Sequence, residues 1–472
     1  MGLHCEWPES KPLPHDRVAK RQKPKLIEPI VDPQLQLAVA LPKGLPDLFD
    51  LFNMPFDNIL FGRVVPQLDD TGVQFLLHYS EAFCSFIHIG TDSLNYFLKT
   101  FMQLAQSRDS ILYALCAWGG FWLQLRDKSS IDYSQPWNYM QKSAKLICKE
   151  IGDSLVPLNN EDFFVLLAFY LIFIGIEVTT GDVCHWGGFL TQCSNLIKSF
   201  GGLEAVAQMF LNNNDIKWLL HNFQFHDLLS LNAVRQGTLM PIEEYEAVLQ
   251  DDVNYGIDPL QGTLGGVYNL FGDIGNSQVM LRRQWAEIED MIEALVERSP
   301  ELEEARRAYF ATVRTTYKSL MEKISGCVQS LLHLQILELD PKELTLQRKL
   351  FELYVLICKI HLNTVVMRLP PSLVQQQDLL LQALELIDEL LDTRMIVLLS
   401  LLILVCGMAC CTSYDRDRMR ERFRKAQLRY HVQNLTRIEE TVEESWVRNP
   451  DGNVVIEWAA LVEEKGWNLY VG

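Results

Sequence analysis

The spacing of apolar residues is helical almost throughout residues 67–472. Apolar side chains recur there three and four positions apart, which places them on one face of a helix. The run 110–118 fits a buried helix, and the run 163–176 is apolar on every face, as in a helix at the centre of a core. A short extended piece at 454–456 is the one strand-like pattern. The sequence therefore predicts an all-α domain over residues 67–472.

Helix starts can be recognised at two places. Ser299-Pro300-Glu301 combines a capping residue, a proline suited to the first helical turn and an acidic residue favoured there. We expect a charged amphipathic helix to begin at this point and to reach about Ser325. Another amphipathic helix is expected to begin near Pro136-Trp137 and to run to Ile151.

The uncharged segment 395–411 has two interpretations. Its length lies at the lower limit for crossing a bilayer, so a membrane-anchored scaffold is one hypothesis. Gly407 and Ala409, however, suit close helix packing, and acidic and basic residues alternate at 415–418, where an anchor prefers a positive flank. We predict a buried core helix and no membrane contact.

The N-terminal part of the chain differs from the rest in charge and backbone preference. Residues 9–66 are first basic and then rich in proline, which favours an extended linker. The basic cluster is typical of a nuclear-import or phosphate-contacting segment, and a solvated basic tail is the alternative. The candidate DNA phosphate contacts are Lys11, Arg17, Lys20, Arg21, Lys23 and Lys25.

Composition narrows the functional class. The chain has 472 residues, 48% of them hydrophobic, and a formal net charge of −18. These proportions are those of a globular protein and exclude a disordered, collagenous or disulfide-rich one. An acidic chain repels phosphate, so most of its surface is not expected to bind nucleic acid. Its eleven cysteines include no Cys-x-x-Cys pair, so they favour buried thiols in an intracellular protein.

The sequence gives no support for catalysis. It contains no Gly-x-Ser-x-Gly, His-Glu-x-x-His or phosphate-binding glycine loop. His226 and Asp227 are adjacent, but no nucleophile can be proposed for them. We therefore predict that the protein is not an enzyme and that it has no catalytic residue and no cofactor.

Three motifs occur in one order along the helical part of the chain, and a C-terminal pattern follows them. The first two motifs comprise Gly181, Asp182, Trp186, Gly201 and Gly202, and then Trp218, Phe223, Phe225, His226 and Asp227. The third motif is Asp258-Pro259-Leu260-x-Gly262, and the C-terminal pattern ends with the 395–411 segment and Gly466-Trp467. Together they resemble the fungal-specific transcription factor domain of zinc binuclear cluster regulators of the lysine and GABA pathway type, in which tyrosine is usual at the position of Phe225.

The resemblance implies a large helical regulatory domain in a sequence-specific, nuclear regulator of RNA polymerase II transcription. It implies promoter DNA and the transcription machinery as partners, with a homodimer and a small-molecule effector as further ones. A soluble helical ligand-binding or scaffold protein without DNA binding is the alternative. Target genes, the choice between activation and repression, the effector and the oligomeric state stay open.

Residues 1–8 resemble the end of a zinc binuclear cluster. In that module six cysteines hold two zinc ions, whereas Cys5 stands alone here. One thiolate is an incomplete zinc ligand set, so we expect this form to bind DNA only weakly and zinc to require a cluster upstream. A misplaced start codon is the favoured explanation; a regulator without the module and an unrelated thiol at Cys5 are the alternatives.

The motif residues have a structural and a functional interpretation. We predict that a set of five residues packs at the centre of the helical body and is structural: Trp186, Phe223, Phe225, His226 and Asp227. His226 and Asp227 are neighbours on one helix and so point about 100° apart, which argues against a catalytic pair. The alternative is that these residues line a pocket for a regulatory metabolite.

Overall fold

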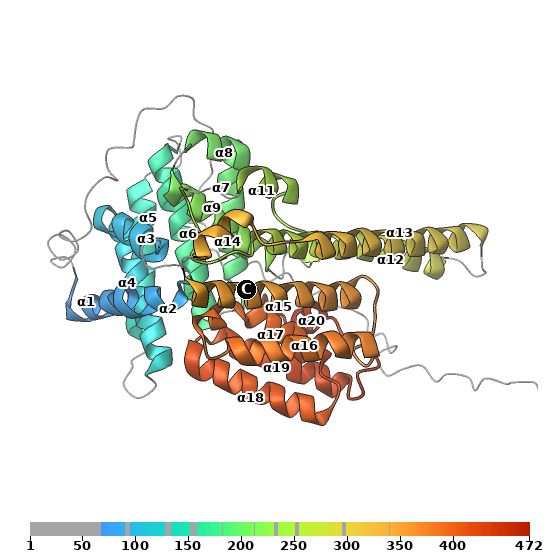
Figure 1. The fold of residues 1–472 in the computed structure, drawn as a ribbon. Helices are drawn as coiled ribbons and strands as arrows, with labels where there is room; N and C mark the ends of the chain where they lie inside the picture. The colour runs from blue at the N-terminus through green and yellow to red at the C-terminus, as the bar shows by residue number, and fades with distance from the viewer. Residues whose placement is uncertain are drawn as a thin grey trace, which may run out of the picture. The chain divides into compact units, whose positions relative to one another are not determined.

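The helical body is seen in a computed structural model, and its described part confirms the all-α prediction (Figure 1). Within that part, the only β-type pairs are two isolated bridges, Ser230 with Tyr470 and Asp258 with Gly262, and residues 454–456 form no strand. The described residues are 68–89, 95–127, 134–151, 158–181, 183–211, 213–230, 235–250, 254–294, 299–338 and 340–472.

Helices α4 and α6 organise the first half of the body. α4 packs against α1, α3, α5 and α6. Gly119 on α4 allows α1 to approach closely, because a Cβ there would lie 2.1 Å from the Phe75 carbonyl oxygen. The elements are α1 (Asp70–Leu77), a π-helical segment (His78–Phe83), α2 (Cys84–Ile87), α3 (Tyr96–Ser107), α4 (Asp109–Arg126), α5 (Ser134–Ile151) and α6 (Asn160–Thr180).

The central apolar helix predicted at 163–176 is α6. Asn159 caps it by accepting from the Asp162 backbone N–H, while the Asp162 carboxylate accepts from the Asn159 N–H. Among the described residues, α6 is the helix long and apolar enough to cross a membrane, but 83% of its most apolar window is buried inside the protein. Such burial is characteristic of a core helix.

The middle of the chain contains two long helices that pack side by side. α12 and α13 contact each other, and their outer parts extend past the ends of α15 and α16 (Figure 1). Ser299 caps α13 by accepting from the Leu302 N–H, as the sequence predicts. The elements are α7 (Trp186–Ser199), α8 (Leu203–Met209), α9 (Asn214–Leu228), α11 (Ile242–Val248), α12 (Gly265–Ala294) and α13 (Pro300–Gly326).

Helices α15, α16, α17 and α19 form the core of the last part. α17 contacts α15, α16, α18 and α19. α18, which is rich in arginine, lies on the outer side of this group (Figure 1). The elements are α14 (Leu331–Leu337), α15 (Pro341–Val365), α16 (Val374–Leu390), α17 (Ser400–Ala409), α18 (Ser413–Tyr430), α19 (Asn434–Arg448) and α20 (Trp458–Glu464).

The segment 395–411 differs from the single helix expected. A short 3₁₀ helix (Arg394–Leu398) precedes α17, which begins only at Ser400. Thr393 starts the 3₁₀ turn by accepting from the Met395 N–H at 3.1 Å. Both parts are buried, apart from Arg394 and Met408. The apolar side chains of both helices other than Met408 are therefore inside the protein.

The contact between α17 and α19 at Gly407 gives a first prediction. A Cβ at Gly407 would lie 2.8 Å from Val442 Cγ1, and the Trp446 indole N–H donates to the Gly407 carbonyl at 2.8 Å. Gly407→Leu overpacks this contact, so we expect it to lower the free energy of unfolding by about 1–3 kcal/mol.

Urea unfolding followed by circular dichroism measures this loss. The matched control is Gly188→Leu on α7, where a Cβ meets no atom within 4 Å. Equal stability of the two variants would contradict the close packing of α17 on α19.

Candidate functional site

The first family motif surrounds the turn between α6 and α7. Gly181 ends α6 with a φ of 69°, and a Cβ there would lie 2.9 Å from the Gln433 backbone, so both conformation and space require glycine. Trp186 begins α7 and is fully buried. Gly201 and Gly202 form the turn after α7 with φ values of 98° and 91°. Asp182 lies outside the described residues.

The aromatic residues of the second motif lie on α9 and point to different neighbours. Trp218 packs edge-on against Phe97 and Phe101, with ring centroids 5.0 and 4.9 Å apart. Phe225 packs edge-on against Tyr268 at 5.4 Å. All three motif aromatics of α9, including Phe223, are buried. They thus tie α9 to α3 on one side and to α12 on the other.

Asp227 holds the segment after α9 in place. Its carboxylate accepts from the Leu239 N–H at 2.8 Å, the Met240 N–H at 3.2 Å and the Tyr245 hydroxyl at 2.8 Å. Burial raises the pKa of Asp227 to about 6, and these three donors oppose that rise by stabilising the charged form. The carboxylate therefore connects α9 with α11.

His226 points to the C-terminal segment. Its Nδ1 lies 2.8 Å from the Tyr470 hydroxyl oxygen, and the two rings are 5.1 Å apart. Burial lowers the pKa of His226 to about 3, so the imidazole is neutral at physiological pH. His226 and Asp227 thus bind different partners and form no acid–base pair.

The C-terminal segment brings the two motifs together. The Trp186 indole N–H donates to the Asn468 carbonyl, and the Trp186 ring lies 5.3 Å from that of Tyr470. Asn434 on α19 donates to the Tyr470 carbonyl at 2.8 Å. We call Trp186, His226, Asn434 and Tyr470 the tail cluster. Sequence reasoning missed Asn434 and Tyr470, because neither stands in a local motif that marks a long-range partner.

The predicted N-terminal sites cannot be placed in the same way. Cys5 and the basic residues of segment 11–25 lie outside the described residues. Within the described part, no three His, Cys, Asp or Glu side chains are grouped so that they could hold a metal ion.

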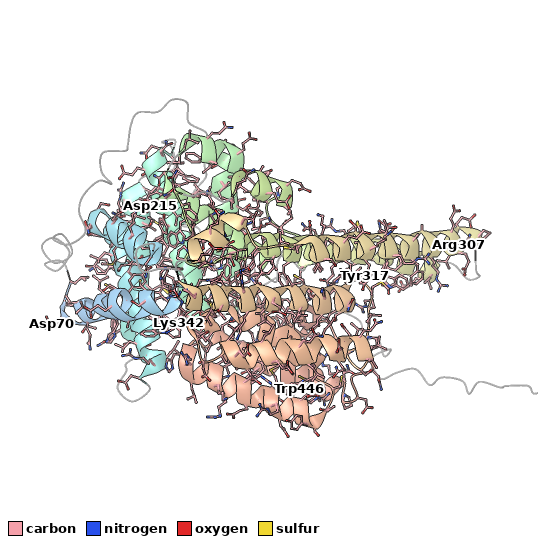
Figure 2. All side chains as sticks on the ribbon, in the orientation of Figure 1. Asp70, Asp215, Arg307, Tyr317, Lys342 and Trp446 are labelled. Carbon is pink, nitrogen blue, oxygen red and sulfur yellow. The ribbon has the colours of Figure 1, made fainter. Side chains whose placement is uncertain are left out.

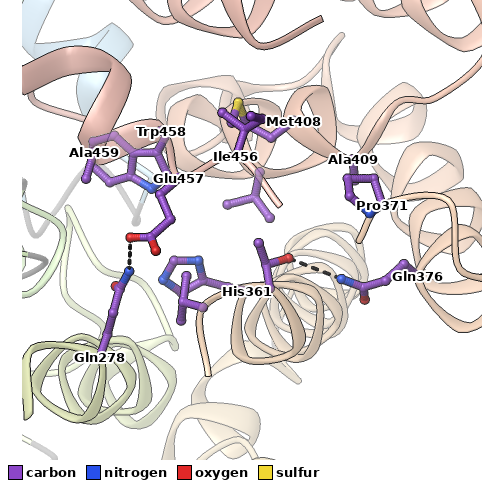
Figure 3. A pocket seen from close by; sticks show the side chains of 13 residues that line it. Gln278, His361, Pro371, Gln376, Met408, Ala409, Ile456, Glu457, Trp458 and Ala459 are labelled. Carbon is purple, nitrogen blue, oxygen red and sulfur yellow. Dashed lines mark hydrogen bonds between the residues drawn. The ribbon is translucent and has the colours of Figure 1, made fainter. Parts of the chain in front are cut away.

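A small cavity lies between α12, α15, α16, α17 and the chain before α20 (Figure 3). Its volume is about 30 Å³, which has room for one or two waters. Gln278, His361 and Glu457 provide polar lining, and the other lining residues are mostly apolar. No residue of the tail cluster lines it.

Glu457 at this cavity joins three parts of the chain. It accepts from Gln278 Nε2 at 3.0 Å and pairs with Arg282 of α12 and with Arg368. Arg368 has a φ of 57°, a left-handed conformation that is uncommon for arginine. The carboxylate is thus already neutralised by groups of the protein itself.

Comparison with known proteins shows which protein family has this helical body. The family model described as fungal specific transcription factor domain matches residues 74–472. The chain belongs to this family. The match covers the whole helical body from within α1 onward and includes both motifs and the tail cluster. This fungal transcription factor domain is therefore built as one set of helices closed by its C-terminal segment.

Two curated relatives agree with the family. An uncharacterized transcriptional regulatory protein of Schizosaccharomyces pombe is 26% identical over 80% of this chain and 67% of its own length. The transcriptional activator protein UGA3 of Saccharomyces cerevisiae is 29% identical over 48% of this chain and 48% of its own length. No solved structure matches. The chain is thus similar to transcriptional regulators, and it spans about two thirds of one and half of the other.

The hydrogen bonds of Asp227 give a second prediction. Asp227→Asn places an amide N–H against groups that are themselves donors, so at least one buried donor loses its acceptor. We expect a loss of about 1–3 kcal/mol in the free energy of unfolding, seen as a lower melting temperature. Glu246→Gln makes the same change of charge at an exposed site on α11 and serves as the control.

Reporter transcription measured on the same variants distinguishes packing from binding. Loss of transcription in proportion to the loss of folded protein supports a structural role for Asp227. Unchanged melting together with lost regulation would support a metabolite pocket instead.

The buried histidines give a third prediction, for pH. Burial, with a smaller effect of Arg282, lowers the pKa of His361 to about 4. In the unfolded chain this imidazole binds a proton below its ordinary pKa of about 6.5, whereas in the folded protein it does so only near pH 4. The free energy of unfolding therefore falls as the pH drops from about 6.5 to 4, and this group does not change it above that range. The lowered pKa of His226 also decreases the free energy of unfolding at low pH, whereas the raised pKa of Asp227 increases it there.

We expect His361→Gln to remove one part of this acid sensitivity. Between pH 7 and pH 4 the wild type should lose about 3 kcal/mol more than the variant, from the pKa shift of this one group. Urea unfolding at each pH measures the difference. Parallel pH profiles for the two proteins would show that His361 is protonated in the folded state.

Proposed function

We propose that this protein is a nuclear transcriptional regulator whose helical body, residues 67–472, controls transcription through contact with a protein partner or an effector. The observation that carries the proposal is the family match over residues 74–472. The names of both curated relatives, a transcriptional regulatory protein and a transcriptional activator, support the same role.

Of the two possible controlling contacts, a protein partner and a small-molecule effector, we favour the protein partner. The cavity of about 30 Å³ is smaller than a metabolite, and its carboxylate already has two arginine partners. The motif aromatics, His226 and Asp227 are buried, and the last two already bond to Tyr470 and Tyr245 of the protein itself. A regulatory ligand would have to open the cavity before it could bind.

We propose that DNA contact in this form is weak and electrostatic, and that zinc is bound only by a form with a complete cluster. The single Cys5 and the basic segment 11–25 support this, because the chain as a whole is acidic with a net charge of −18. Without a base-reading helix, phosphate contacts give affinity but no sequence selectivity.

A reporter assay tests the regulatory role. The full chain, fused to an unrelated DNA-binding domain, should change transcription from a promoter that carries the site of that domain. The same fusion with the Gly407→Leu body should be less effective, in proportion to its folded fraction. A reporter unaffected by the well-folded wild-type fusion would contradict the proposal and favour a helical protein with no role in transcription.

Gel shifts of the purified chain test the DNA contact. We expect dissociation constants of roughly 10⁻⁴ to 10⁻⁶ M at physiological salt, equal for random and promoter DNA and weaker as salt rises. A triple change to glutamine in the N-terminal segment should weaken binding, whereas a matched triple change on α18 should not. The two sets are Lys20, Arg21 and Lys23, and Arg418, Arg424 and Lys425. Selective nanomolar binding, or stoichiometric zinc in the pure chain, would contradict this part.

A further inference from the structure

The outer side of α5 carries exposed cations. Lys142, Lys145 and Lys149 follow one another at intervals of three and four residues, so they form a row along one side of the helix. All three side chains are exposed. Trp137, in the first turn of the same helix, is 44% exposed. We call these three lysines and Trp137 the α5 face.

The lysines of the α5 face have no acidic partner within the described part of the chain. Lys142 Nζ lies 3.7 Å from the centre of the Tyr113 ring, a contact that positions the ammonium group without neutralising it. On the basic helix α18, by contrast, Arg429 pairs with Asp392. The α5 face is thus a cationic surface on a chain with a net charge of −18, and it suits an anionic occupant.

The chain enters the described body beside the α5 face. The Asp69 carboxylate, which caps α1, accepts a hydrogen bond from the Tyr139 hydroxyl of α5. Tyr139 stands three residues before Lys142, which is about one helical turn. Asp70, the first residue of α1, lies at the outer edge of the body (Figure 2). The residues that precede Asp69 are therefore tethered next to the row of lysines.

The segment 45–61, which lies outside the described residues, has a complementary composition. Its charged residues are Asp47, Asp50 and Asp57, so it carries three negative charges and no positive one. More than half of its residues are apolar, and four of these are phenylalanine. Alternation of acidic and apolar residues is typical of segments that bind a protein surface.

We propose that the segment 45–61 docks on the α5 face. Its three aspartates then meet the three lysines, and its phenylalanines meet the exposed ring of Trp137. The apolar stems of the lysine side chains cover further apolar residues of the segment. The contact is made within one chain. While the segment is docked it occludes the α5 face, so a partner of either surface has to displace it.

The length of the connection permits this contact. Residues 62–67 reach up to about 20 Å when they are extended. Lys149, the lysine farthest from Tyr139, lies about 15 Å from it along α5. A short tether gives an effective concentration in the millimolar range, so a contact with a dissociation constant of roughly 0.1 mM keeps the segment docked about nine tenths of the time. The contact should weaken at high salt, because exposed charges are screened.

Limited chymotrypsin digestion of the full chain tests the proposal, because the protease cleaves after phenylalanine in the segment only when the segment has left α5. Each cleavage rate within residues 45–61 is divided by the rate for a synthetic peptide of the same sequence. We expect the wild-type segment to be cut about tenfold more slowly than its peptide at low salt. Lys142→Glu, Lys145→Glu and Lys149→Glu together should bring the rate to within about twofold of the peptide.

Reversal of the segment instead should have the same effect. The variant carries Asp47→Lys, Asp50→Lys and Asp57→Lys together. A chain with both sets of changes should be cut about as slowly as the wild type, because opposite charges face each other again. This recovery separates loss of docking from misfolding, since changes in the segment do not repair a damaged body.

A matched control reverses three exposed cations of α13 and should leave the tenfold protection unchanged. It carries Arg307→Glu, Arg314→Glu and Lys318→Glu together. The proposal is overturned if the wild-type segment is cut as fast as its peptide. It is equally overturned if reversal of the lysines leaves the rate unchanged, which would leave the α5 face to another partner, or if the chain with both sets of changes is cut as fast as either parent variant.

Discussion

The structure depends on two buried polar side chains of α9, His226 and Asp227, which both find hydrogen-bond partners inside the protein. A buried polar group without a hydrogen bond is costly, so His226 and Asp227 permit only folds that supply those partners. Asp227 obtains them from the chain that follows α9, and His226 obtains one from Tyr470. The tail cluster thereby holds the end of the chain against α7 and α9, which lie more than 200 residues earlier in the sequence.

This constraint explains why the family motifs are found where they are. Gly181 brings the turn after α6 against Gln433, next to Asn434 of the tail cluster. Trp186 and His226 then hold the C-terminal segment from two sides. Ion pairs hold another part of the body together at Glu457, where one carboxylate joins α12 to the segments around Arg368 and α20. The motif residues thus hold the fold together, and the partner contact that we propose would fall on the exposed surfaces of the body.

Much of the fold could be predicted from local patterns. The cap at Ser299 and the apolar run of α6 follow from neighbouring residues, because caps and periodicity are local properties. The break in the segment 395–411 could not be predicted, since its composition is apolar on both sides of Ser400. The partners of the motif residues could not be predicted either. His226 and Tyr470 are 244 positions apart, and the pairing of two such residues is set by packing of the whole body.

Hydrogen exchange of the Tyr470→Ala chain tests most directly whether the tail cluster closes the helical body. We expect faster amide exchange in α7, α9 and the start of α19, with little change in α13. Tyr414→Ala, at a tyrosine that is 71% exposed on α18, should leave all of these helices unchanged. Unaltered exchange in α7 and α9 of the Tyr470→Ala chain would show that the tail cluster does not close the helical body.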